Sequence, residues 1–280
     1  MAFFWHALLG LIQGLTEFLP VSSSGHLAAA RMMIERWAPA TAGPILSAPP
    51  LFLEVCLHVG TLATVIVIYR KDLWQILTGM DLAVRQTLSG KGMSAWNEDR
   101  WARLGLSVVA ASVPTAILGF ALKRPAERVG ESLFSLGVAY VVLTAVLAST
   151  RWIRGGSAST DLRRALLVGL AQGIAVFPGI SRSGLTISAG LAAGLDREEA
   201  ARLSFLLSIP AVAGAALIKI REGYAEIGLN AVPGYVLGGL SAFLVGCAAL
   251  YLLVRIVRAG RLWLFAPYTA IMGIVLISLG

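Results

Sequence analysis

Long apolar stretches recur along this chain, and they constrain its fold more than any other feature. Six of them are long enough, at about 20 residues each, to cross the hydrocarbon core of a bilayer as helices. These predicted spans are 51–69, 103–122, 133–150, 202–219, 233–254 and 262–279. Charged residues make up 14% of the 280 positions, against about 25% in a soluble domain. The sequence therefore predicts an all-α integral membrane protein and excludes a large soluble domain.

Two further apolar regions, 1–36 and 163–195, are interrupted near the middle by Pro, Gly and Ser. Each half has about 10–15 residues and is too short to span a bilayer. Broken backbone at membrane depth is tolerated only where it lines a cavity or is buried in protein. We therefore expect a re-entrant helical hairpin in each region, with an ordinary span over 1–20 as the alternative. Segment 72–100, which mixes charges with tryptophans, is expected to form an interfacial helix and loop.

An internal repeat relates the two interrupted regions. The run Gly10–Gly25 (GLIQGLTEFLPVSSSG) aligns without gaps with Gly169–Gly184 (GLAQGIAVFPGISRSG), and eight of the sixteen positions are identical. Three predicted spans follow each copy, and a re-entrant hairpin returns to the side it left, so the two copies must have opposite topology. Inverted repeats of this kind occur in transporters. We expect a single membrane domain over 1–280, with repeat one at about 1–150 and repeat two at about 163–280.

The distribution of Lys and Arg predicts the orientation of the chain. The loops after the first, third and fifth predicted spans carry 13 of these residues, and the opposite side carries seven. The positive-inside rule then puts the richer loops in the cytoplasm and both termini outside. The first hairpin would enter the membrane from the outer face and the second from the cytoplasmic face. Basic loops facing anionic lipid also account for the net charge of +8, so no nucleic-acid partner is expected.

Ionisable side chains inside a membrane are costly, and each is a functional candidate. Gln13 and Glu17 are four residues apart and share one helix face, and the run Ser22–His26 (SSSGH) follows them. A carboxylate, a hydroxyl and an imidazole together supply an ion or proton partner, a nucleophile and a general acid or base. The alternative is that the serines only cap the next helix. Glu54 and His58 open the first predicted span and either face this site or lie at the interface.

The second repeat carries Arg182 at the position of Ser23, between Ser181 and Ser183. A guanidinium with flanking hydroxyls and backbone N–H groups at a helix N-terminus is suited to a phosphate-like anion. The two hairpins together would therefore set an anion-binding group opposite the candidate nucleophiles.

Two runs, Gln13–His26 (QGLTEFLPVSSSGH) and Pro178–Thr186 (PGISRSGLT), resemble the signature motifs of the bacterial undecaprenyl-diphosphatase family, historically the bacitracin-resistance proteins. The resemblance covers nearly the whole chain. It implies a hydrolase of the bacterial inner membrane that converts undecaprenyl diphosphate to undecaprenyl phosphate and inorganic phosphate. That reaction recycles the lipid carrier for peptidoglycan and other cell-wall polymers, and overproduction of the enzyme confers bacitracin resistance. The implied partner is the membrane lipid substrate, with a homodimer as an option.

The resemblance also implies roles for residues at matching positions. The implied catalytic residues are Glu17, Ser23, His26 and Arg182. The implied substrate-binding residues are Gln13, Ser22, Ser24, Gly25, Ser181, Ser183, Gly184 and Thr186, with Glu54 in support. Glu17 and Gln13 would hold a divalent cation, Mg²⁺ or Ca²⁺. Many relatives have a second glutamate where this chain has Gln13, which leaves one carboxylate for the ion.

The nucleophile and the function each have an alternative at this stage. In one mechanism Ser23 attacks the terminal phosphorus and His26 handles the proton, and in the other His26 is the nucleophile and Ser23 a ligand. The site is expected to open to the outer, periplasmic face. An alternative function, a secondary transporter or polyprenyl-phosphate flippase, is compatible with the same inverted repeat.

Overall fold

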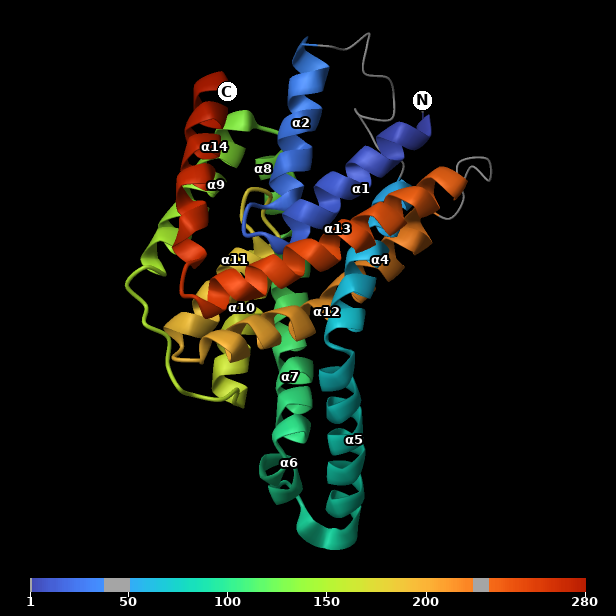
Figure 1. Ribbon diagram of the computed structural model, residues 1–280, viewed down its shortest axis with the longest axis vertical. Helices are drawn as coiled ribbons and strands as arrows, with labels where there is room; N and C mark the ends of the chain where they lie inside the picture. The colour runs from blue at the N-terminus through green and yellow to red at the C-terminus, as the bar shows by residue number, and fades with distance from the viewer. Residues whose placement is uncertain (1, 38–50, 224–231) are drawn as a thin grey trace.

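The protein is built from helices, which the computed structural model describes over residues 2–37, 51–223 and 232–280 (Figure 1). In chain order the elements are α1 (Ala2–Phe18), α2 (Ser23–Trp37), α4 (Leu51–Ile68), α5 (Arg70–Gln86), the π-helical turn η1 (Thr87–Lys91), α6 (Ser94–Glu98), α7 (Arg100–Ala121), α8 (Lys123–Gly130), α9 (Leu133–Ser149), α10 (Leu162–Ile174), α11 (Arg182–Ala192), α12 (Arg197–Gly223), α13 (Val232–Arg258), the 3₁₀ turn η4 (Leu262–Phe265) and α14 (Ala266–Leu279). The predicted all-α class is confirmed for the described residues.

Four helical stretches in the described ranges are long and apolar enough to cross a membrane. They are Arg100–Ala121, Arg197–Arg221, Val232–Arg258 and Leu262–Leu279. Two bent pairs qualify when each is taken as one unit: Phe52–Ile68 with Arg70–Lys91 at 73°, and Lys123–Gly130 with Leu133–Ser149 at 110°. The count is therefore four spans, or up to six with the bent pairs. Each of the six predicted segments falls within one of these helices or pairs or extends past it by one residue at an end, and the multi-pass membrane architecture is confirmed.

Segment 72–100 contains the helix and loop expected there. α5 continues from α4 after the bend, packs against α7, and leads through η1 into α6 at one end of the molecule (Figure 1). Trp74, Leu77 and Leu82 of α5 are exposed. Apolar side chains on an outer surface are suited to contact with lipid or its interface.

Both interrupted regions contain a break between two helices. α1 ends at Phe18 and α2 begins at Ser23, while α10 ends at Ile174 and α11 begins at Arg182. α1 has 17 residues, slightly more than the sequence predicts for a half-helix, and α11 has 11. In Figure 1, α1 and α2 meet near the middle of the molecule, and their outer ends lie on the same side. A re-entrant hairpin in this region stays a prediction.

Glycines of the repeated sequence bring helices from the two halves into close contact. α1 packs on α13, and the corresponding helix α10 packs on α7. An added methyl group at Gly10 would overlap the carbonyl oxygen of Gly238, and one at Gly169 would overlap that of Ala111. Small residues allow this approach between membrane helices, where packing replaces the hydrophobic effect as the driving force. The repeated glycines therefore have the same packing role in both halves.

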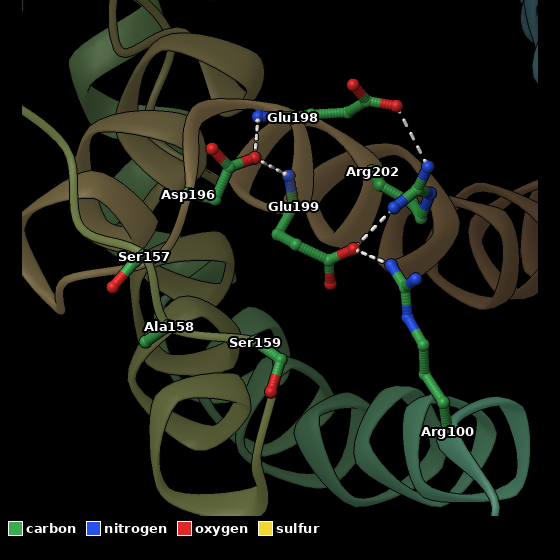
Figure 2. Close-up of a pocket in the computed structure, with 8 residues that line it drawn as sticks. All are labelled: Arg100, Ser157, Ala158, Ser159, Asp196, Glu198, Glu199 and Arg202. Carbon is green, nitrogen blue, oxygen red and sulfur yellow. Dashed lines mark hydrogen bonds and ion pairs between the residues drawn. The ribbon is translucent and has the colours of Figure 1, made fainter.

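An ion-pair network joins α12 to α5 and α7 beside a cavity of about 460 Å³. Glu199 of α12 is 8% exposed and accepts hydrogen bonds from Arg100 of α7 and from Arg202 (Figure 2). Arg202 also pairs with Asp72 of α5, with 3.0 Å between Nε and Oδ1. Ion pairs beside the cavity therefore connect three helices.

Replacing Glu199 should destabilise the protein. In Glu199→Gln the partly buried Arg202 loses one of its carboxylate partners, and breaking a buried pair costs about 3 kcal/mol. The free energy of unfolding, measured by SDS titration in detergent micelles with circular dichroism, should fall by this amount.

The matched control is Glu98→Gln. Glu98 pairs with Lys91 at 3.4 Å, and both side chains are more than half exposed. An exposed pair contributes less than about 1 kcal/mol. Equal losses in the two variants would contradict a structural role for the Glu199 network.

Candidate active site

The breaks of the two repeats meet in space. Ser22 Oγ accepts the backbone N–H of Gly179 at 3.1 Å, and Ser183 Oγ donates to the carbonyl oxygen of Phe18 at 2.8 Å. These partners are 157 and 165 residues apart in sequence. The two polar loops therefore form one site, as their sequence similarity predicts.

Each loop is built by the same hydrogen bond at the start of the following helix. Ser22 Oγ accepts the backbone N–H of Gly25, and Ser181 Oγ accepts that of Gly184, both at 3.2 Å. This is a serine N-cap, which satisfies a helix-terminal N–H that has no partner in the helix. Ser22 and Ser181 thus each cap a helix, as the capping alternative describes for the first loop, and contact of either hydroxyl with substrate stays a prediction.

Ser22 also has an unusual backbone conformation. Its φ of 65° is the one left-handed value at a non-glycine residue among the described residues. Such a conformation costs about 1–3 kcal/mol and persists where surrounding contacts enforce it. Here the two N–H groups bound by Ser22 Oγ hold the turn, and the turn presents the next residue, Ser23, toward α1.

Glu17 is the centre of the site. Its side chain is 10% exposed, and its Oε1 accepts from Arg182 Nη2 at 2.8 Å. Its Oε2 accepts from Ser23 Oγ at 2.8 Å and from Gln13 Nε2 at 3.1 Å. Gln13 Nε2 lies 3.3 Å from His58 Nδ1, so His58 belongs to the same cluster. The Ser23 hydroxyl therefore has a carboxylate, which can act as a base, within hydrogen-bond distance.

Two buried polar atoms of the cluster have no partner among the described residues: Arg182 Nη1 and Gln13 Oε1. Buried polar atoms are almost always hydrogen-bonded, so each of these atoms can still form a hydrogen bond with a ligand. The guanidinium is 17% exposed and can hold Glu17 through Nη2 while Nη1 binds an anion. The ion pair borders a narrow crevice whose lining is otherwise largely apolar: Glu17, Phe18, Thr61, Leu62, Val65, Arg182, Ser208 and Val212.

His26 lies in the same loop but has different partners. Its Nδ1 is 2.7 Å from the carbonyl oxygen of Ser22 and 3.0 Å from Tyr140 Oη, and its Nε2 is 2.5 Å from Tyr268 Oη. Because a carbonyl oxygen can only accept, we assign the proton of the neutral ring to Nδ1. Within the described part of the chain no hydrogen bond joins His26 to Ser23. In the structure Ser23 Oγ donates to Glu17, and the role of His26 in proton transfer stays a prediction.

Two further residues of the predicted site, Ser24 and Thr186, differ in their exposure to solvent. Ser24 is exposed, with its Oγ 3.4 Å from Ser22 Oγ. Thr186 is fully buried, donates to the carbonyl oxygen of Arg182 at 2.7 Å and lies 2.6 Å from Ser204 Oγ. Its hydroxyl is thus used in helix packing, and contact between Thr186 and substrate stays a prediction.

Glu54 forms an ion pair with Lys219 of α12, and both side chains are about one-third exposed. It lies one helical turn before His58, which contacts Gln13. The sequence left the direction of both side chains open. The structure brings His58 to the Glu17 cluster and gives Glu54 a different charged partner.

Tyr140 of α9 and Tyr268 of α14 complete the surroundings of His26, and the sequence analysis missed both. They lie 114 and 242 residues from the histidine they contact. Both belong to predicted spans, where tyrosine is an ordinary residue. No local pattern in the sequence marks them.

A cation is compatible with the donor atoms of the cluster only if other groups complete its coordination. The described residues contain no group of three or more His, Cys, Asp or Glu side chains arranged to hold a metal. Gln13 Oε1 has no partner, whereas both Glu17 oxygens already accept hydrogen bonds from Arg182, Ser23 and Gln13. These two side chains are too few for an all-protein site, so a Mg²⁺-like ion would also need waters and substrate oxygens, and the cation stays a prediction.

Comparisons with known proteins identify relatives of the whole chain. The family model described as "Bacitracin resistance protein BacA" matches residues 6–275. A Desulfosudis oleivorans protein named undecaprenyl-diphosphatase is 42% identical over 279 residues, covering 98% of this chain and 97% of the relative. A Korarchaeum cryptofilum protein of the same name is 41% identical over 272 residues, with 97% of each chain covered. The chain therefore belongs to the family of bacitracin resistance protein BacA.

Proposed function

We propose that this protein hydrolyses undecaprenyl diphosphate to undecaprenyl phosphate and inorganic phosphate, and so returns the lipid carrier to cell-wall synthesis. Its full-length relatives carry the name undecaprenyl-diphosphatase. The observation that carries the proposal is the cluster of Ser23, Glu17 and Arg182 at the junction of the two broken helices. It combines a nucleophile, a base and an anion-binding group within hydrogen-bond distance of one carboxylate, and Glu17 and Arg182 also border a narrow crevice lined by apolar side chains.

The first chemical step transfers the terminal phosphoryl group to Ser23. Arg182 binds the diphosphate through Nη1 while Nη2 stays on Glu17. Ser23 Oγ attacks the terminal phosphorus as its proton passes to Glu17 Oε2. The Oγ–P bond forms, the bond from that phosphorus to the bridging oxygen breaks, and the lipid monophosphate leaves with this oxygen. Positioning and charge neutralisation are the main needs of phosphoryl transfer, and Arg182 supplies both.

The second step hydrolyses the phosphoserine. A water oxygen attacks the phosphorus, its proton passes to His26 Nε2, and the Oγ–P bond breaks. Ser23 Oγ recovers its proton from Glu17, His26 Nε2 gives its proton to solvent, and inorganic phosphate leaves. In the alternative mechanism His26 Nε2 is itself the nucleophile and carries the phosphoryl group.

We also propose that a divalent cation, Mg²⁺ or Ca²⁺, assists the reaction. Gln13 Oε1 and Glu17 would hold it together with diphosphate oxygens, and it would neutralise substrate charge. Gln13 positions Glu17 in any case, because its Nε2 donates to that carboxylate.

Replacing the base or the nucleophile should abolish most turnover. For Glu17→Gln we expect kcat to fall by about 10³-fold, since a general base contributes about 10²–10⁴-fold, and Ser23→Ala should fall at least as far. The measurement is phosphate release from undecaprenyl diphosphate by the purified protein in detergent. Ser149→Ala, which removes an exposed hydroxyl on α9, is the matched control. Wild-type turnover in Glu17→Gln would exclude the proposed site.

A rapid acid quench identifies the nucleophile in the same preparations. Substrate labelled with ³²P at the terminal phosphate should leave an acid-stable label on the wild type and none on Ser23→Ala. An acid-labile label that persists in Ser23→Ala would assign the attack to His26. A wild type that releases no phosphate would overturn the proposed activity itself.

Cation removal should stop the reaction reversibly. A chelator should reduce turnover to background, and Mg²⁺ or Ca²⁺ should restore it. Gln13→Ala should raise the cation concentration for half-maximal activity about tenfold, because ligand-shell changes typically cost about 10–100-fold in metal affinity. Full activity in the presence of chelator would contradict a role for the ion.

We propose an inverted topology for the two repeats, with the site open to the outer face of the cytoplasmic membrane. Two observations support the proposed topology. α1 packs on α13 and α10 packs on α7, so each pair joins one repeat to the other, and the two loops have matching N-caps. Both termini should then lie outside. In intact spheroplasts, tags at either end should react with an impermeant reagent, whereas protection of both tags would reverse the orientation.

A lipid flippase on the same fold is the second candidate function. Broken helices that meet from two repeats are typical of transporter sites. A Ser23→Ala protein that still moves labelled polyprenyl phosphate across liposomes would support this function, and transport dependent on Ser23 would argue against it.

A further inference from the structure

His26 is held on two sides by tyrosines. Tyr140 is fully buried, and its hydroxyl donates to the carbonyl oxygen of Ser22 at 3.3 Å, beside Nδ1 of His26. Tyr268 is 44% exposed, and its ring is parallel to the imidazole within 3°. Since Nδ1–H is used by Ser22, Nε2 is the ring nitrogen with a free lone pair, and Tyr268 donates to it at 2.5 Å. The reactive nitrogen is therefore covered by a phenol from α14.

The two tyrosines come from one rigid pair of helices. α9 and α14 pack closely, and an added methyl group at Gly137 would lie 2.8 Å from the carbonyl oxygen of Gly273. Thr144 and Thr269 join the same helices through their hydroxyls at 2.9 Å. The position of Tyr268 relative to Tyr140 is thus set by backbone contact, and a rigid support of this kind can orient a reacting group.

The site contains two separate polar units. Ser23 is bonded to Glu17, and His26 is bonded to Tyr268. When Ser23 attacks, its proton can pass to Glu17, so this step needs no proton transfer to His26. The hydrolysis of the phosphoserine, however, needs a base for water, and Nε2 is the ring acceptor available for it. The Tyr268 oxygen lies on this acceptor, where the oxygen of a water molecule bound to Nε2 would lie.

We propose that Tyr268 is a positioning residue for the dephosphorylation half of the reaction, which rests on the phosphoserine route proposed above. In the free enzyme its hydroxyl occupies the place of the attacking water on His26 Nε2, and its ring fixes the plane of the imidazole. When the phosphoserine has formed, water takes this position at Nε2, and the displaced Tyr268 hydroxyl donates a hydrogen bond to the water oxygen and orients it. The water oxygen bonds to phosphorus, its proton goes to Nε2, and Ser23 Oγ leaves with the proton from Glu17.

A Tyr268 variant should therefore slow dephosphorylation without changing phosphorylation. Tyr268→Phe keeps the ring and removes the hydroxyl, so dephosphorylation should slow about tenfold, the loss expected for one hydrogen bond of about 1.4 kcal/mol. Tyr268→Ala also removes the stacked ring, and a misplaced catalytic group can cost about 10²-fold. The phosphorylation rate should be unchanged in both variants, because Glu17 and Ser23 are intact.

The test is rapid-quench labelling of the full-length protein in detergent with undecaprenyl diphosphate carrying ³²P at the terminal phosphate. Tyr268→Phe should accumulate acid-stable phosphoenzyme at steady state, and His26→Ala should accumulate more. Tyr251→Phe is the matched control, because Tyr251 of α13 is 64% exposed, and it should behave as the wild type.

Slower phosphorylation with no accumulation in Tyr268→Phe would overturn the inference, since a merely structural defect affects both steps. Wild-type kinetics in that variant would overturn it as well. If the wild type itself forms no acid-stable phosphoenzyme under rapid quench, the phosphoserine route of the proposed function fails first. The two failures are therefore distinguished in one experiment.

Discussion

The ion pair between Glu17 and Arg182 determines how the two halves of this protein meet. Both side chains are largely withdrawn from solvent, and a lone charge in such surroundings would cost several kcal/mol. The partners are 165 residues apart, so separating the two broken helices would leave each charge buried and unpaired. The pair satisfies one nitrogen of the guanidinium and leaves Nη1 free. The same contact that joins the halves therefore prepares a buried donor for an anion.

The broken backbone beside this pair is satisfied by serines. Backbone groups without partners are not tolerated at membrane depth, and the hydroxyls of Ser22 and Ser183 bond to backbone groups of the opposite loop. Ser23 differs from these serines, because its hydroxyl bonds to the Glu17 carboxylate. The left-handed turn at Ser22 gives Ser23 this direction. The backbone conformation thus directs the hydroxyl of Ser22 to backbone groups and that of its neighbour Ser23, the candidate nucleophile, to a carboxylate.

The sequence predicted the spans and breaks well, because hydropathy and the Pro, Gly and Ser interruptions are local properties. It also predicted that Arg182 approaches Glu17 and Ser23, since the repeat implies two loops meeting near one axis. It did not indicate the hydrogen-bond partners of individual atoms. The proton of Ser23 is held by Glu17, and His26 contacts Tyr140 and Tyr268, because these contacts depend on how distant helices pack. The sharp bend of 110° between α8 and α9 was likewise not foreseen.

The two repeats share some residues of the aligned runs and differ at others. Positions that both copies share build the frame: Ser22 and Ser181 cap helices, and Gly10 and Gly169 allow close packing. Even the shared glutamine is structural in the second copy, where Gln172 donates to the carbonyl oxygen of Leu207.

The positions where the copies differ hold the reactive groups. Glu17, Ser23 and His26 align with Val176, Arg182 and Leu185. Two identical loops would place like charges against each other, which is unfavourable in a buried site. Placing the carboxylate in one copy and the guanidinium in the other turns a repulsive contact into an attractive one. Divergence at these few positions therefore gives the packing junction its carboxylate, its guanidinium and the hydroxyl between them.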